Sequence, residues 1–210
     1  MHPASSSRPV QRQRLHLLGL PLALAVAGGL AACSKSDEPA AKAATADSSL
    51  PPAQVYEKVA TTGKGFTVGA LMSANPVFVL FDPQCPHCGH LWGTSQPLLN
   101  KAKFIWMPVS FINGKSAPQG AAILGAANPA EFMAAHEASL LAGTGGAPIT
   151  GGTPPELEAA IKANTELFNS LKVESVPFIV AKNIKTGNVV THAGAMETVS
   201  YTHLRAHETR

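Results

Sequence analysis

The sequence has 210 residues, of which 45% are hydrophobic and 14% charged, and this size suits one domain with a buried core. Its formal net charge is +3, but every arginine lies in the first fourteen or the last six residues. From Cys33 to Thr198 there are eleven lysines, no arginine and twelve acids, a net charge of −1. This near-neutral segment has no basic surface for nucleic acid, which excludes nucleic acid as a partner.

The first 32 residues predict a lipoprotein signal peptide. A basic stretch precedes an apolar run that glycine and proline interrupt and that is too short for a good membrane span. The run ends in Leu30-Ala31-Ala32-Cys33, which resembles the bacterial lipobox; the alternative is an ordinary signal peptide that ends near a cysteine. The lipobox resemblance implies cleavage before Cys33 and a lipid on that residue, and Ser34 after it favours the outer membrane over the inner one.

Either kind of signal sends the domain to an oxidising compartment, where disulfides persist. We therefore expect a lipid-anchored protein of the periplasm. Residues 33–50 are rich in alanine, serine and proline, with mixed charge and no large apolar residue before Leu50. They predict a flexible tether that lets the domain stand off the membrane.

Residues 51–198 predict an α/β domain. A short helix near residues 55–59 and a short strand in "GFTVGA" come first, and "PVFVLF" at residues 76–81 is typical of a buried central strand. The pattern becomes helical from Pro86, a residue that suits a first helical turn. A second buried strand is predicted at residues 103–111. Strand, helix and strand together predict a βαβ unit.

Three helices are predicted in an insertion at about residues 113–171, and Thr153 is expected to cap the third of them. His136, in the second helix, is interpreted as a core or surface histidine and not as a catalytic one. After the insertion, Phe178 to Val180 predict a strand that Pro177 precedes. Residues 188–194 predict a paired final strand.

The segment "FDPQCPHCGHLW" at residues 81–92 holds two of the three cysteines, Cys85 and Cys88. A c-type haem site would need a histidine where Gly89 stands. A structural zinc site needs four ligands, and neighbours within one helical turn cannot all face one ion. Copper on the two thiolates stays open. A CxxC that follows a buried strand and opens a helix in an exported chain favours a thioredoxin-type redox motif.

The redox interpretation assigns different roles to the two cysteines. At a helix N-terminus, unpaired N–H groups and the helix dipole would stabilise a Cys85 thiolate, so we expect Cys85 to be the nucleophile. Cys88, one turn further on and more covered, would be the resolving thiol. Pro86 and His87 would tune the pair, although His87 could instead be an exposed spacer. No cofactor and no metal are expected.

The order of these motifs resembles the DsbC/DsbG group of periplasmic thiol-disulfide interchange proteins, with DsbG the most similar. The resemblance is carried by "DPQCPHCGHLW", the alanine-rich insertion and the "VP" dipeptide, and it covers about residues 50–197. It implies a thioredoxin-like fold with a helical insertion between the CxxC helix and a cis-proline strand. It also implies that Val176 and Pro177 form the cis-proline loop, in which Val176 binds the substrate backbone.

The sequence departs from that group in ways that leave the direction of exchange open. Only about 17 residues separate Cys33 from the fold, too few for the group's N-terminal dimerisation domain, so a monomer is expected. CPHC with Val-Pro is the pattern of the oxidase DsbA, yet the buried acid that DsbA holds six residues before its first cysteine is Val79 here.

Several functions are compatible with this mixture of features. We expect an oxidoreductase that acts on protein thiols and disulfides, in the manner of a DsbG/DsbC-like isomerase or reductase. A DsbA-like oxidase and a copper-binding thiol chaperone are the alternatives, and a redox-inert, chaperone-like binding module is favoured only if the cysteines prove unreactive. The pair would be recycled by an inner-membrane partner, either DsbD-like or DsbB-like.

Residues 199–210 are expected to be a non-native tail. Arginine, absent from Cys33 to Thr198, appears twice in the last six residues. One permitted codon choice for residues 199–209 also spells a DNA sequence that resembles a transposase-type sequencing adapter. The expected native C-terminus beyond about residue 198 is therefore unknown from this sequence.

Overall fold

The computed structural model describes residues 50–149 and 151–194. The predicted signal peptide, Cys33, the tether up to residue 49 and the predicted tail lie outside the described residues and stay predictions. The elements in chain order are α1 (Pro52–Thr62), β1 (Phe66–Gly69), β2 (Val77–Phe81), α2 (Pro86–Ser95), the 3₁₀ turn η1 (Gln96–Leu98), β3 (Lys103–Pro108), α3 (Ser116–Gly125), α4 (Pro129–Leu141), α5 (Pro155–Ser170), β4 (Phe178–Lys182) and β5 (Val189–Ala193).

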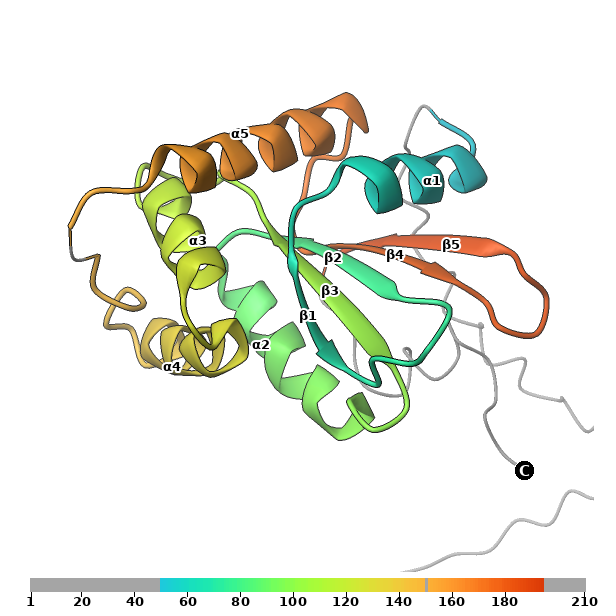
Figure 1. The fold of residues 1–210 in the computed structure, drawn as a ribbon, viewed down its shortest axis with the longest axis horizontal. Helices are drawn as coiled ribbons and strands as arrows, with labels where there is room; N and C mark the ends of the chain where they lie inside the picture. The colour runs from blue at the N-terminus through green and yellow to red at the C-terminus, as the bar shows by residue number, and fades with distance from the viewer. Residues whose placement is uncertain (1–49, 150, 195–210) are drawn as a thin grey trace, which may run out of the picture. The chain divides into compact units, whose positions relative to one another are not determined.

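The described strands form one mixed sheet in the order β1-β3-β2-β4-β5 (Figure 1). Strands β2 and β3 are parallel and α2 connects them, which confirms the predicted βαβ unit. The other neighbouring strands pair antiparallel, and β4 pairs with β5 as predicted. Helices α1 and α5 lie on one side of the sheet and α2 on the other (Figure 1), so all five residues of β2 are buried.

Three helices, α3, α4 and α5, lie between β3 and β4. The third begins later than predicted: Thr153 is not its cap, because the N-cap is Pro154 and the helix starts at Pro155. A residue that precedes proline avoids the helical backbone region, and Pro154 accordingly has φ −57° and ψ 136°. No helix in the described part of the chain is long and apolar enough to cross a membrane.

The strand register brings two distant segments to one edge of the sheet. The CPHC segment follows the end of β2, where Val109, directly after β3, donates its backbone N–H to the Phe81 carbonyl oxygen over 2.8 Å. Strand β4 runs antiparallel to β2 and pairs Phe178 with Leu80. The start of β4, and Pro177 before it, therefore lie next to the end of β2.

Candidate active site

Cys85 is the N-cap of α2, with an extended backbone (φ −96°, ψ 111°), and Pro86 opens the helix as predicted. The carbonyl oxygen of Cys85 accepts the backbone N–H groups of Cys88 at 2.9 Å and Gly89 at 3.3 Å. This first turn is built around the two cysteines, which are both free thiols in the structure. Cys85 is 4% exposed and Cys88 is fully buried, so the accessible part of the pair belongs to Cys85.

The Cys85 thiol is the more acidic of the two. A hydrogen bond from the Cys88 side chain lowers the pKa of Cys85 from its ordinary value of 9.0 to about 7, and the backbone N–H groups of Cys88 and His87 act in the same direction. Burial and the charge of Asp82 oppose this shift without cancelling it. A thiol with this pKa is substantially ionised at neutral pH, and the thiolate is the nucleophilic form.

Cys88 has the opposite environment. Burial raises the pKa of Cys88 well above its ordinary value, and the hydrogen bond to Cys85 and the charges of Cys85 and Glu137 raise it further. The Cys88 thiol therefore keeps its proton and donates it to the hydrogen bond that stabilises the Cys85 thiolate. The two cysteines differ in the way that a nucleophile and a resolving thiol require.

The predicted tuning residue His87 is exposed. Its contribution to the Cys85 thiolate comes through its backbone N–H. The helix start therefore lowers the pKa of Cys85 through backbone N–H groups of α2. Any residue at position 87 other than proline would supply the same N–H group.

The Val176–Pro177 loop lies beside Cys85. The peptide bond between these residues is cis, as the resemblance implied. The Cys85 thiol donates to the Val176 carbonyl oxygen, with Sγ and O 3.6 Å apart. The structure thus brings together, at one edge of the sheet, two segments that are 91 residues apart in the sequence.

Asp82 organises the loops of the site, and the sequence analysis gave it no role. Its side chain is fully buried, and Oδ1 accepts the backbone N–H of Gln84 at 2.7 Å. Oδ2 accepts the N–H groups of Phe111 and Ile112 at 2.7 and 2.8 Å. The carboxylate thus joins the CPHC segment to the loop after β3. Its position directly after a buried strand is the feature of the sequence that could have identified Asp82 as a site residue.

His136 joins the helical insertion to the CPHC segment from the core, which agrees with its predicted structural role. The Ala147 N–H donates to Nδ1 over 3.0 Å, so Nε2 carries the proton and donates to the Pro83 carbonyl oxygen over 2.7 Å. Burial lowers the pKa of His136, which keeps the ring neutral. Next to it, the Gln84 amide donates to the side-chain oxygen of Gln119 in α3.

Glu137 is the second residue that sequence reasoning missed. It is 1% exposed, and neither carboxyl oxygen has a hydrogen-bond partner. A Cβ atom at Gly89 of α2 would lie only 2.6 Å from Oε2 of Glu137. Burial, followed by the charges of Cys85 and Asp82, raises the pKa of Glu137 to about 9. No sequence signal separates Glu137 from a surface glutamate on an alanine-rich helix.

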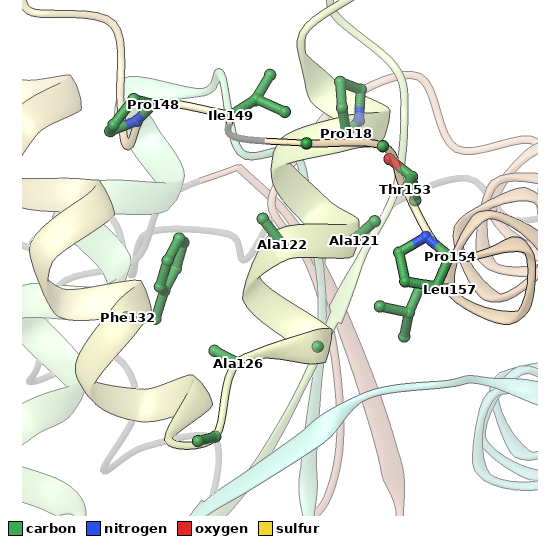
Figure 2. A pocket seen from close by; sticks show the side chains of 14 residues that line it. Pro118, Ala121, Ala122, Ala126, Phe132, Pro148, Ile149, Thr153, Pro154 and Leu157 are labelled. Atoms are coloured by element: carbon green, nitrogen blue, oxygen red, sulfur yellow. The ribbon is translucent and has the colours of Figure 1, made fainter.

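A cavity of about 400 Å³ lies between α3, α4 and α5, away from the cysteines. Figure 2 shows Ala121, Ala122, Phe132 and Leu157 among the side chains that line it. Its lining includes no titratable residue and no residue of the CPHC or Val176–Pro177 segments. The cavity is therefore separate from the cysteine site.

Within the described residues, no three His, Cys, Asp or Glu side chains are arranged to hold a metal ion. Copper held by the two thiolates alone needs fewer ligands than that, and it stays a prediction.

No family model matches the sequence, and no curated protein matches it. Solved structures do match. The catalytic domain of Proteus mirabilis ScsC superposes with a TM-score of 0.56 at 16% identity, over 73% of this chain and 93% of that one. A periplasmic thioredoxin-like protein from Salmonella enterica serovar Typhimurium gives 0.55 at 16% identity, over 72% and 94%. The thiol-disulfide exchange protein α-DsbA2 from Wolbachia pipientis gives 0.51 at 16% identity, over 72% and 94%.

The fold is thioredoxin-like. The predicted fold class, α/β with a helical insertion before the cis-proline strand, is thereby confirmed. The likeness to the ScsC catalytic domain and to α-DsbA2 is a distant structural one.

Proposed function

We propose that the chain is a periplasmic thiol–disulfide oxidoreductase that exchanges disulfides with protein substrates through Cys85 and Cys88. The observation that carries this proposal is the unequal pair: a Cys85 thiol with a pKa of about 7 at the start of α2, in contact with a fully buried Cys88 whose pKa is raised. Two structural neighbours, described as a periplasmic thioredoxin-like protein and as a thiol-disulfide exchange protein, support it.

The pKa of Cys85 favours a reducing or isomerising role. A lower nucleophile pKa stabilises the reduced pair and makes the disulfide a stronger oxidant. Thioredoxin has a nucleophile pKa of about 7 and DsbA one of about 3.5. At about 7, Cys85 resembles the first, which supports a DsbG/DsbC-like reductase or isomerase over a DsbA-like oxidase. A DsbD-like inner-membrane partner would then return electrons to the pair.

The remaining parts of the proposal concern the surroundings of the pair. Val176 and Pro177 would contact the backbone of the client next to the cysteine that Cys85 attacks. Lipid on Cys33 would hold the domain at the outer membrane, on the periplasmic side. The domain would act as a monomer, so light scattering should give one chain per particle, and a stable dimer would contradict this.

The experiment that tests the proposed function is the capture of mixed disulfides. Cys88→Ser should accumulate covalent complexes with client proteins, because the resolving thiol is absent, whereas Cys85→Ser should form none. Non-reducing electrophoresis of the two variants compares them directly. Equal capture by both variants, or by neither, would refute the assignment of roles.

A further inference from the structure

The carboxyl group of Glu137 in α4 is buried against Gly89 of α2, close to the cysteines. Helix α4 packs against α2 at Gly89, whose missing side chain leaves room for the carboxyl group of Glu137. Gly89 directly follows Cys88, and both are buried. The carboxyl group thus lies against the backbone of α2 at the residue after Cys88, and its charge acts on the Cys88 thiol. A side chain at position 89 would occupy that space.

The Glu137 carboxyl makes no hydrogen bond within the described residues that would explain why it is buried. Both oxygens are buried without a hydrogen-bond partner, although buried polar groups in native proteins are almost always paired. A leucine or glutamine would fill the same space without burying an ionisable group. Such an unpaired group needs an explanation, and a redox or proton-transfer role is one of the recognised ones.

The titratable neighbours of Glu137 are the groups of the redox centre. Cys85 and Asp82 act on its ionisation, and Glu137 in turn acts on that of Cys88. Helix α3 and strand β1, which also pack against α4, contain no titratable residue. The adjacent His136 is engaged at both ring nitrogens, by Pro83 and Ala147. Among the residues that the structure describes, the charges that act on Glu137 are those of Cys85 and Asp82.

We propose that Glu137 carries the proton of the resolving thiol Cys88 during disulfide exchange. This inference rests on the proposed function and adds a group to its machinery. It makes the helical insertion, through α4, part of the redox chemistry of α2.

The exchange step balances as follows. When Cys85 is held in a mixed disulfide with a client, its negative charge is gone, which removes one of the causes that raise the pKa of Glu137. The ionised fraction of Glu137 then takes the proton of Cys88, and the sulfur of Cys88 bonds to that of Cys85. The client sulfur leaves with the electron pair of the broken bond, so the pair has lost two electrons and the client disulfide has gained two. In the reverse direction a client thiolate attacks Cys85 of the disulfide, and Glu137 returns the proton to the departing Cys88 thiolate.

The pKa of Glu137 is about 9 while Cys85 is a thiolate, so at neutral pH the reduced protein holds Glu137 protonated and ready to donate in the reverse step. The pKa of Cys88 is also raised well above its ordinary value, so its proton needs a stronger base than a carboxylate in water. A carboxyl group with an ordinary pKa would be a much weaker acceptor for this buried thiol. Burial thus raises the pKa of Cys88 and the pKa of Glu137 together.

The test uses the reduced full-length protein and the aromatic disulfide DTNB, whose thiolate is coloured. Attack by Cys85 releases one coloured thiolate, and attack by Cys88 on the resulting mixed disulfide releases a second. Glu137→Gln should slow the second release at least about tenfold at neutral pH while leaving the first within about twofold. The pH midpoint of the second release should also move upward, because Cys88 must then lose its proton to solvent.

Glu131→Gln, on the exposed first turn of the same helix, is the matched control and should behave like the unaltered protein. Gly89→Ala, which displaces the carboxyl group without removing it, should also slow the second release and serves if Glu137→Gln does not fold. An unchanged rate and pH midpoint for the second release, or equal slowing of both releases, would overturn the role of Glu137. Failure of the unaltered protein to give a second release would instead contradict the proposed function.

Discussion

At the residue scale, the properties of the site come from a contrast between two thiols three positions apart. Cys85 caps α2 and receives hydrogen bonds, whereas Cys88 is fully buried and supplies one of them. The largest cause of the low pKa of Cys85 is the Cys88 side chain, and the backbone N–H groups come after it. The acidity of the nucleophile therefore depends on its partner being present as a thiol.

Alkylation of Cys85 measures this dependence. Iodoacetamide should modify Cys85 in the reduced protein with a pH midpoint near 7, because only the thiolate reacts. In Cys88→Ala the midpoint should rise, since the donor is lost, and in Cys88→Ser it should rise less, because a hydroxyl group can still donate. Mass spectrometry of quenched samples gives the rates. Identical midpoints in both variants and the unaltered protein would show that Cys88 does not set this pKa.

At the element scale, the contact between α2 and α4 depends on one of the two glycines of α2. A Cβ atom at Gly89 would meet Oε2 of Glu137 at 2.6 Å and Cγ of Leu141 at 3.2 Å, whereas a Cβ atom at Gly93 would meet nothing within 4 Å. The packing of α4 on α2 therefore requires a glycine at position 89, whereas it places no such requirement on position 93.

The two substitutions by alanine should consequently have opposite signs. Gly89→Ala should lower the free energy of unfolding by about 1–3 kcal/mol, because α4 must move away from α2. Gly93→Ala should raise it by up to about 1 kcal/mol, because alanine has the higher helix propensity. Urea unfolding followed by circular dichroism compares them, each variant acting as the control for the other. A stabilising Gly89→Ala would mean that α4 does not pack as described.

At the scale of the whole molecule, burial of Glu137 makes stability depend on pH. Its pKa is about 9 in the folded protein against an ordinary value of 4.5, so between these values the folded state holds a proton that the unfolded state has lost. The resulting stability is fully present below pH 4.5 and is lost progressively as the pH rises towards 9. Cys85 acts in the opposite direction between pH 7 and 9, where the folded state has lost a proton that the unfolded state keeps.

Glu137 should therefore lower the stability of the reduced protein between pH 5 and 7, at up to about 1.4 kcal/mol per pH unit. His136, whose pKa burial lowers, acts in the opposite direction in this range. Glu137→Gln should remove the component from Glu137, so its stability relative to the unaltered protein should increase from pH 5 to pH 7. Urea unfolding of both proteins under reducing conditions at the two pH values gives the difference, in which the other titrating groups cancel. A difference that does not change with pH would show that Glu137 is ionised normally in the fold.

The sequence by itself determined the α/β fold class, the order of the main elements and the place of the CxxC cysteines at the start of a helix. These features are local: the apolar run of β2, proline at the start of α2 and two cysteines one helical turn apart can all be read from neighbouring residues. The pairing of Val176–Pro177 with the cysteines was available only through the resemblance to known proteins. The structure confirms it by the contact of Val176 with Cys85.

Only the tertiary structure decided which polar residues serve the site. Asp82 accepts N–H groups from two loops, His136 joins the insertion to Pro83, and Glu137 lies buried against Gly89. Each contact joins segments far apart in the chain, except the hydrogen bond that the Gln84 N–H donates to Asp82. A glutamate in an alanine-rich helix looks the same in sequence whether it is exposed to solvent or buried against another helix. Burial sets the pKa of such a group, and burial is a property of the packed chain.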